Sequence, residues 1–154
     1  MKALSLWQPW ASLWCSPNKR HETRDWQMHH RGRLLVHATK KFVRDVDDEL
    51  EDILSSEFGG HWGMELPTGA LIGAVDVLDC IPTQKLYRNL DRMTDDDRID
   101  FACGDFSDGR YGFLRGTYWI FREPIPYRGH QTIFDVPNGV VADAFANARE
   151  FIGG

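Results

Sequence analysis

The stretch TGALIGAVDVLD, residues 68–79, carries the strongest strand signal in the chain. It is a nearly continuous apolar run of strand length, and its glycines Gly69 and Gly73 indicate a bend or a bulge in a curved sheet. A second uninterrupted run, LLVHA at residues 34–38, predicts a central strand. A sheet built on these two strands is therefore the centre of the predicted fold.

Further strands are predicted on either side of this pair. Residues 2–7 alternate as a short strand does, residues 20–26 have an extended pattern, and residues 111–123 (YGFLRGTYWIFRE) form another candidate. A short helix is predicted to open at Pro9, because proline is well tolerated in a first helical turn. Helical spacing puts three large apolar residues on one face of it: Trp10, Leu13 and Trp14.

Three longer helices are predicted from capping residues followed by helical spacing. Thr39 is placed as the N-cap of a helix that runs to about residue 57, and Thr94 as the N-cap of a helix at residues 94–103. Asn138 is placed as the cap of a closing helix that includes Phe151. The apolar stripe of the first of these helices consists of Phe42, Val46, Leu50, Ile53 and Leu54. The order of elements predicts an α+β domain, a small mixed sheet or barrel with helices outside it.

Length and composition limit the class of protein. With 154 residues, 42% of them hydrophobic, the chain is predicted to form one folded domain, residues 1–154. The longest uncharged, largely apolar run, residues 66–75, is too short to cross a bilayer, and the N-terminal segment lacks the apolar core of a signal peptide. We therefore expect a cytoplasmic protein with no membrane partner. The oligomeric state is left open.

No metal or cofactor is predicted. The three cysteines include no CxxC pair, so neither a disulfide framework nor a structural zinc site is indicated, and buried thiols are expected. The histidines lack a spacing such as HExxH, and the glycine-containing loop at residues 104–112 lacks the pattern of a phosphate-binding P-loop.

Charge is distributed unevenly along the chain. A net charge of -5 argues against a protein that coats nucleic acid by bulk electrostatics. Residues 19–41, however, hold seven lysines and arginines against two acidic residues, together with four histidines. The acidic stretch at residues 45–57 is expected to be a solvated helix face. One locally basic segment is thus the candidate for contact with an anionic partner.

The segment KRHETR, residues 19–24, contains the chemistry of greatest interest. In an extended chain Glu22, Arg24 and Trp26 share one face. A carboxylate between two cations can accept hydrogen bonds from an exocyclic amine or a ribose hydroxyl, while the cations contact phosphate and tryptophans stack on a base. Alternatively Lys19 acts as a base in a hydrolase, or Glu22 and Arg24 form an ordinary surface ion pair.

Several segments in one order resemble the ASCH domain of the PUA-like superfamily. They are SLWQPWA (residues 5–11), KRHETR (19–24), RG (31–32), VHA (36–38), PIPYRGHQ (124–131) and FDVP (134–137). The resemblance covers nearly the whole chain. It implies a twisted, partly closed β-barrel whose flanking helices frame a cleft, in a group associated with RNA and nucleotides.

The family's mark is a Gly-x-Lys-x-x-Glu-x-Arg pattern, which here has Pro17 in place of the glycine. If that glycine normally has a positive φ, Asn18 is the residue expected to adopt the left-handed conformation instead. A related family of amidohydrolases that deacetylate N-acetylcytidine implies a threonine where this chain has Glu22, so that activity is not transferred directly. Other relatives are associated with cleavage of single-stranded RNA.

We therefore predict a domain that binds RNA or a modified nucleoside in a cleft around the Lys-x-x-Glu-x-Arg motif. The alternative is a hydrolase that uses Lys19, Glu22 and Arg24 as catalytic residues, either a single-stranded RNA ribonuclease or a nucleoside amidohydrolase. A third hypothesis is that the protein is an interaction module with buried tryptophans and no nucleic-acid ligand. The full set of predicted binding residues is Trp7, Gln8, Trp10, Lys19, Glu22, Arg24, Trp26, Arg31, Arg110, Tyr111, Arg128 and Gln131.

Overall fold

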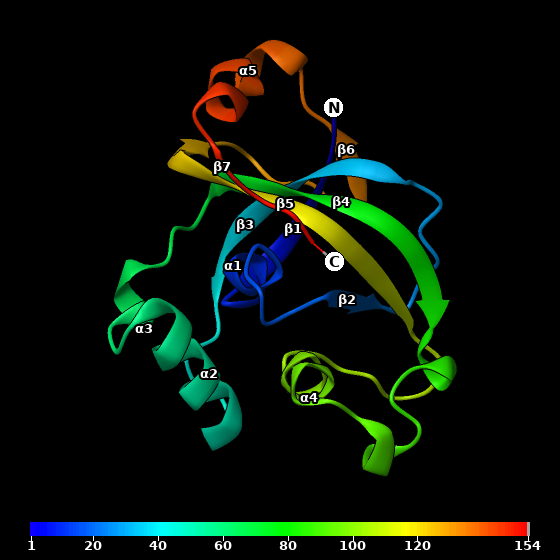
Figure 1. The fold of residues 1–154 in the computed structure, drawn as a ribbon. Coiled ribbons are helices and arrows are strands. Elements are labelled where there is room, and N and C mark those ends of the chain that lie inside the picture. The colour runs from blue at the N-terminus through cyan, green and yellow to red at the C-terminus, as the bar shows by residue number, and fades with distance from the viewer. Residues whose placement is uncertain (154) are drawn as a thin grey trace.

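A computed structural model describes residues 1–153 as one curved, mixed β-sheet flanked by helices (Figure 1). The strands are β1 (Lys2–Gln8), β2 (His21–Arg24), β3 (Gly32–Phe42), β4 (Ala70–Pro82), β5 (Tyr111–Pro126), β6 (Ile133–Asp135) and β7 (Arg149–Phe151). The α-helices are α1 (Trp10–Trp14), α2 (Asp48–Phe58), α3 (Trp62–Glu65), α4 (Asp95–Ala102) and α5 (Asn138–Ala146). Two short 3-10 helices, η1 (Thr83–Lys85) and η2 (Leu90–Arg92), lie between β4 and α4. No helix among residues 1–153 has the length and apolar character needed to span a membrane.

The seven strands are hydrogen-bonded in the order β2-β5-β4-β3-β1-β6, with β7 paired to β5. Among the strands of residues 1–153, only β1 and β3 pair in parallel, and the other pairs are antiparallel. Within the described residues this path does not close, because β2 and β6 are not paired with each other. The structure thus shows a mixed sheet with flanking helices, and the barrel implied by the family resemblance is not confirmed.

The two predicted core strands form the middle of the sheet. The register between β4 and β5 shifts between Leu71 and Gly73, so the predicted irregularity at Gly73 is confirmed. A Cβ atom on Gly73 would lie 2.1 Å from the carbonyl oxygen of Trp119, which leaves space only for glycine. Successive residues of β3 face opposite sides, so that Val36 and Leu35 belong to two different core clusters. The sheet is therefore buried on both faces at this strand.

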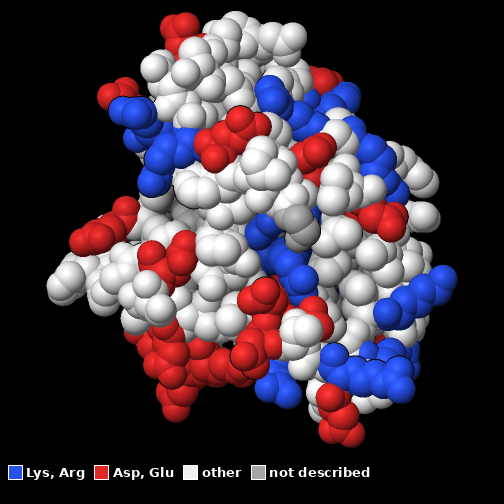
Figure 2. Space-filling view, viewed as in Figure 1, with Lys and Arg blue, Asp and Glu red and all other residues white. Residues whose placement is uncertain are grey.

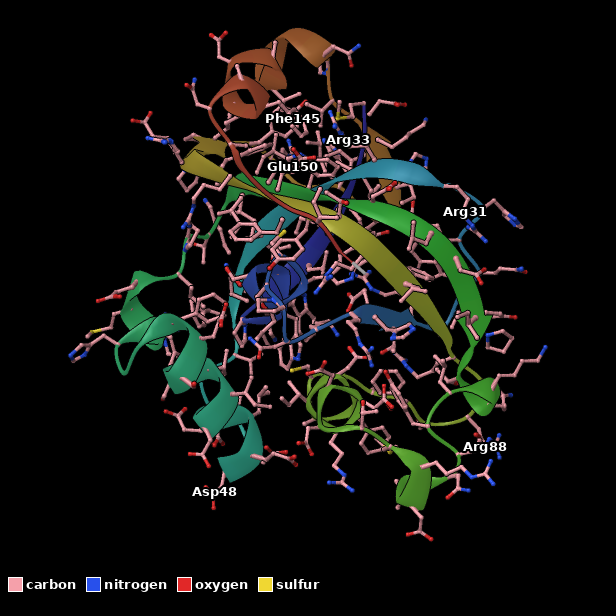
Figure 3. The ribbon with its side chains drawn as sticks, viewed as in Figure 1. Arg31, Arg33, Asp48, Arg88, Phe145 and Glu150 are labelled. Atoms are coloured by element: carbon pink, nitrogen blue, oxygen red, sulfur yellow. The ribbon has the colours of Figure 1, made fainter. Side chains whose placement is uncertain are left out.

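Helices cover the two faces of the sheet. In Figure 1, α1 lies under the sheet and α5 lies above it. Trp14 of α1 is fully buried in one core cluster, whereas Val141 of α5 packs in the other. The guanidinium of Arg33 lies 4.3 Å from the ring centroid of Trp119 and 4.5 Å from that of Phe145, which stabilises α5 on the sheet (Figure 3).

The predicted helix at Thr39 is wrong in its start, and its apolar face is correct only from Leu50 onward, because Phe42 lies in β3 and Val46 precedes α2. Residues through Phe42 continue β3, because β1 pairs alongside and the amide of Val43 still donates to Gln8 O at 2.8 Å. The helix α2 begins at Asp48, where the Asp47 carboxylate accepts from the Leu50 amide at 2.8 Å. The predicted stripe packs in a third cluster that also holds Leu13, Trp62 and Cys103. Acidic residues of α2 gather on the surface at the lower left of Figure 2, as expected for a solvated face.

The other two helix predictions had different outcomes. The helix capped by Thr94 is confirmed, since α4 carries a complete capping box between Thr94 and Asp97. The closing helix is wrong at both ends: its N-cap is Pro137 and not Asn138, and it ends at Ala146, after which the chain adds β7 to the edge of β5 and does not continue the helix to Phe151. There the ring of Phe151 stacks on Tyr118 at 4.9 Å between centroids, an apolar contact that the sheet edge offers and a longer helix would lose. Cys15 and Cys103 are buried free thiols as expected, and Cys80 is half-buried.

Candidate nucleic-acid-binding site

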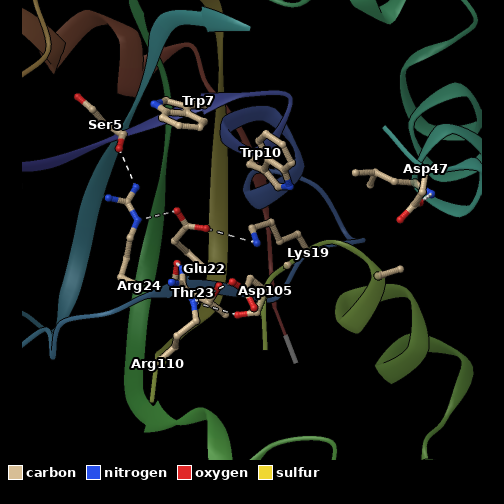
Figure 4. A pocket seen from close by; sticks show the side chains of 13 residues that line it. Ser5, Trp7, Trp10, Lys19, Glu22, Thr23, Arg24, Asp47, Asp105 and Arg110 are labelled. Atoms are coloured by element: carbon tan, nitrogen blue, oxygen red, sulfur yellow. Dashed lines mark hydrogen bonds and ion pairs between the residues drawn. The ribbon is translucent and has the colours of Figure 1, made fainter. Parts of the chain in front are cut away.

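A pocket of about 610 Å³ opens between the ends of β1 and β2, the helix α1 and the loop that follows α4 (Figure 4). Six of the predicted binding residues line it: Trp7, Trp10, Lys19, Glu22, Arg24 and Arg110. The remaining lining residues are Ser5, Thr23, Asp47, Leu50, Ala102, Gly104 and Asp105. We call this cavity the motif pocket, because it contains all three residues of the Lys-x-x-Glu-x-Arg motif.

The carboxylate of Glu22 is held between the two cations of the motif (Figure 4). Glu22 Oε1 lies 3.4 Å from Lys19 Nζ, and Glu22 Oε2 accepts from Arg24 Nε at 3.0 Å. Lys19 is 1% exposed and also donates to the carbonyl oxygen of Cys103 at 2.9 Å, while Arg24 donates to the carbonyl oxygen of Ser5 at 2.8 Å. Because buried charges are costly without partners, these contacts fix the geometry of all three side chains.

The turn that carries Lys19 into the pocket is built around Arg115 of β5. Arg115 is buried and donates to the carbonyl oxygens of Trp14 at 2.9 Å, Lys19 at 3.2 Å, and Ser16. These carbonyls lie in and just after α1, where a helix leaves such acceptors without partners. Burial lowers the pKa of Arg115, but the guanidinium remains charged because its ordinary pKa is very high.

The expectation of a left-handed Asn18 is wrong. In residues 1–153 the non-glycine residues with positive φ are Tyr87 and Thr132. The turn is closed by side chains instead: Ser16 Oγ donates to the Leu13 carbonyl at 2.6 Å and accepts from the Asn18 amide at 3.3 Å. Proline is therefore accommodated at position 17 without a left-handed residue after it.

The start of β2 is clamped by Asp100, a fully buried residue of α4. Its carboxylate accepts from the amides of Arg20 at 2.6 Å and His21 at 3.0 Å, from His21 Nδ1 at 2.7 Å and from the Tyr87 hydroxyl at 2.6 Å. Burial acts to raise the pKa of Asp100, but the interactions with His21, Tyr87 and Lys19 outweigh it and lower the pKa to about 2. Asp100 is thus an ionised anchor that holds the motif segment against α4.

Aromatic rings stand at the mouth of the motif pocket. Trp7 is 52% exposed and Trp10 is partly buried. The ammonium of Lys41 lies 4.6 Å from the ring centroid of Trp7, a cation–π contact at the surface. Trp26 lies apart from both and packs edge-on against Phe113, with 5.2 Å between ring centroids, as part of the core.

Arg110 enters the motif pocket from the loop between α4 and β5. It donates to the carbonyl oxygen of Thr23 at 2.9 Å and pairs with Asp105 at 3.6 Å. The pocket is thereby lined by three cations and three carboxylates, so its charges balance. The carboxylates are those of Glu22, Asp47 and Asp105.

The other predicted binding residues lie outside the motif pocket. Gln8 is fully buried and donates to Ser12 Oγ and to the carbonyl oxygen of Pro67, both at 2.8 Å. Tyr111 is half-buried on β5, and Arg31 is exposed and donates to the Met28 carbonyl at 2.9 Å. Arg128 and Gln131 line a second cavity of about 980 Å³, which we call the basic groove.

Comparison with known sequences identifies the family of this chain. The sequence profile described as the ASCH domain matches residues 4–98, more than half of the chain and all of the motif. The chain belongs to the ASCH domain family. Activating signal cointegrator 1 from mouse and from human are 37% and 36% identical to this chain in an alignment of 94 residues that covers 55% of the chain. That match spans 15% of the length of each of these relatives.

Solved structures of low sequence identity support the fold. The ASCH protein of Zymomonas mobilis is 13% identical, with a TM-score of 0.52 over 96% of this chain and 95% of that one. A serine-to-alanine variant of the same protein gives a TM-score of 0.55 at 14% identity, with 96% of both chains covered. These likenesses show that the architecture is that of an ASCH domain. Within residues 1–153, no cluster of three His, Cys, Asp or Glu side chains is arranged to hold a metal ion.

Proposed function

We propose that this ASCH domain binds single-stranded RNA by taking one nucleoside into the motif pocket. The observation that carries the proposal is the Lys19–Glu22–Arg24 arrangement, with Lys19 and Glu22 buried, in a pocket that the exposed Trp7 also lines. Membership of a family associated with RNA supports it. Single-stranded nucleic acids are bound where bases can stack on aromatic rings and present their edges to fixed polar groups.

The size and charge of the motif pocket fit a neutral nucleoside. About 610 Å³ falls in the range of small-ligand pockets, roughly 300–1,000 Å³. Glu22 is oriented by Lys19 and Arg24, so its remaining lone pairs can accept from an exocyclic amine or a ribose hydroxyl. Because three carboxylates balance the three cations, a phosphate gains little here and a neutral ligand with donors and acceptors is favoured.

The hydrolase alternative uses the same residues, and we favour binding over it for a geometric reason. The hydrolase requires Lys19 as its base, but Lys19 Nζ already donates to the Cys103 carbonyl and faces the Glu22 carboxylate. A general base must have a lone pair free to take a proton from the substrate or water. Lys19 instead directs its N–H groups at two acceptors, whereas Glu22 is fixed by its two cationic partners and keeps lone pairs that can accept from a ligand.

Exchanging Glu22 for glutamine is expected to weaken nucleoside binding at least tenfold. The change keeps the size of the side chain but replaces an ionised acceptor, and hydrogen bonds to charged groups contribute about 1.5–3 kcal/mol. Quenching of tryptophan fluorescence by adenosine, cytidine, uridine and their N-acylated forms measures the affinity. Glu123→Gln, an exposed residue of β5 outside both cavities, is the matched control and is expected to bind as the wild type does.

Mass spectrometry of the same mixtures, together with short single-stranded RNAs, distinguishes the two functions. A binding domain returns every nucleoside and RNA unchanged. Product formed by the wild type and lost in Glu22→Gln, with affinity retained, would replace the binding proposal with the hydrolase. Equal quenching by Glu22→Gln and the wild type, without product, would contradict both.

A further inference from the structure

We propose that the basic groove is a second subsite, which holds the phosphate backbone of the RNA strand whose nucleoside occupies the motif pocket. This inference rests on the proposed function and adds to it the path of the strand. The groove is lined by residues from β1, β3, the residue before β4, the end of β5 and the loop that follows β5. They are Ser5, His37, Thr39, Lys40, Gly69, Pro126, Tyr127, Arg128, Gly129, His130 and Gln131.

The two cavities adjoin at a single residue, Ser5 of β1, which lines both. The carbonyl oxygen of Ser5 accepts from Arg24 in the motif pocket at 2.8 Å. Its hydroxyl lies 3.0 Å from His37 Nδ1 in the basic groove. A strand that leaves the motif pocket past Ser5 therefore enters the basic groove directly.

The wall of the groove at His37 is pre-formed. His37 Nε2 lies 2.7 Å from the carbonyl oxygen of Tyr127, which can only accept, so Nε2 carries the proton and Nδ1 accepts from the Ser5 hydroxyl. A Cβ atom on Gly129 would lie 2.6 Å from both Ser5 Oγ and His37 Cε1. The loop thus packs closely on Ser5 and His37 at the junction between the two cavities.

Charge separates the roles of the two cavities. The motif pocket has three cations and three carboxylates among its lining residues, whereas the basic groove has Lys40 and Arg128 and no carboxylate. Both cations are exposed, and the exposed His130 and Gln131 add further donors. Uncompensated cations attract phosphate, which positions a nucleic acid without reading its sequence. The groove therefore suits the anionic backbone and the motif pocket suits the base.

The test compares each nucleoside with an RNA tetramer, a single strand of four identical nucleotides that carry the same base. The wild type is expected to bind a tetramer at least tenfold more tightly than the matching nucleoside. A double variant, Lys40→Gln with Arg128→Gln, is expected to lose most of that gain, about tenfold in affinity, and to keep its nucleoside affinity. A plot of log affinity against log salt concentration has a negative slope. The double variant is expected to reduce its magnitude by about 1.4, since it removes two phosphate contacts and each contact on a single strand contributes roughly 0.7.

Arg92→Gln is the control, because Arg92 is an exposed arginine outside both cavities. It is expected to bind both tetramers and nucleosides as the wild type does. Tetramer binding by the double variant equal to that of the Arg92 control would overturn the second subsite, as would a wild type that gains nothing from tetramers. In either case nucleoside binding that still depends on Glu22 would leave the proposed function standing, so the two failures are distinguishable.

Discussion

Replacing Asp100 with alanine is expected to lower the free energy of unfolding by about 3 to 5 kcal/mol, a loss typical of breaking a buried ion pair. Asp100 is fully buried, and its removal leaves two amides, the His21 ring and the Tyr87 hydroxyl without their acceptor. Urea denaturation at neutral pH measures the loss. Asp96→Ala, at an exposed position in the first turn of the same helix, is expected to cost less than about 1 kcal/mol.

The dependence of this difference on pH tests its electrostatic origin. The pKa of Asp100 is lowered from its ordinary value of 3.8 to about 2, so the folded state favours the ionised form. Ionised Asp100 therefore contributes about 2 kcal/mol to the free energy of unfolding. This contribution is complete above the pKa of Asp100 in the unfolded state and is lost as the pH falls through its pKa in the folded state. The gap in stability between the wild type and Asp100→Ala should narrow between about pH 5 and pH 2. A gap that is constant over this range, or no larger than that of Asp96→Ala, would contradict the role assigned to Asp100.

Replacing Arg115 with methionine is expected to lower the free energy of unfolding by about 2 to 4 kcal/mol and to weaken nucleoside binding as well. The variant keeps an apolar stem but leaves the carbonyls of Trp14, Ser16 and Lys19 buried without this donor, at a cost of roughly 1–3 kcal/mol for each unsatisfied group. The expected total is smaller than the sum because removing a buried charge relieves part of the penalty.

Binding distinguishes positioning of Lys19 from a general loss of stability. Affinity for a nucleoside is measured at a temperature where Arg115→Met is fully folded by circular dichroism. Because Arg115 holds the turn that presents Lys19, the folded variant is expected to bind several-fold more weakly. Arg122→Met, an exposed arginine on the same strand, is the control for both measurements. Unchanged affinity in folded Arg115→Met would show that the turn does not depend on this side chain for its functional geometry.

The centre of the fold could be predicted from the sequence because local pattern and tertiary context agree there. The apolar runs at residues 34–38 and 68–79 became adjacent central strands, and Gly73 marks a register shift. The predicted helix boundaries were wrong where pairing between distant strands competed with local helix signals. Phe42 is opposite Gln8 of β1, and Phe151 is opposite Tyr118 of β5, contacts that no local pattern encodes.

The candidate site, too, could be predicted from the sequence only in part. The motif spacing on one strand face correctly placed Glu22 and Arg24 together but wrongly included Trp26, which packs against the core. Trp7, Trp10 and Arg110, also predicted as binding residues, line the same pocket. The residues that hold the site in place, Asp100 and Arg115, were missed. Asp100 acts across 80 residues of sequence on Arg20, and Arg115 acts across 101 residues on Trp14. A single aspartate or arginine at such a distance has no sequence signature, so only the folded structure reveals it.

Binding of RNA in the motif pocket is tested most directly by NMR. The indole N–H signals of the six tryptophans are followed during titration with a single-stranded RNA tetramer. In the proposed complex the nucleoside lies against Trp7 and Trp10, whereas Trp14 and Trp62 are buried in core clusters and do not line the pocket. The signals of Trp7 and Trp10 are predicted to shift on saturation in the wild type and to shift far less in Glu22→Gln, while those of Trp14 and Trp62 stay in place. Unmoved Trp7 and Trp10 signals at saturating RNA, or shifts confined to the other tryptophans, would contradict the claim that the motif pocket binds RNA.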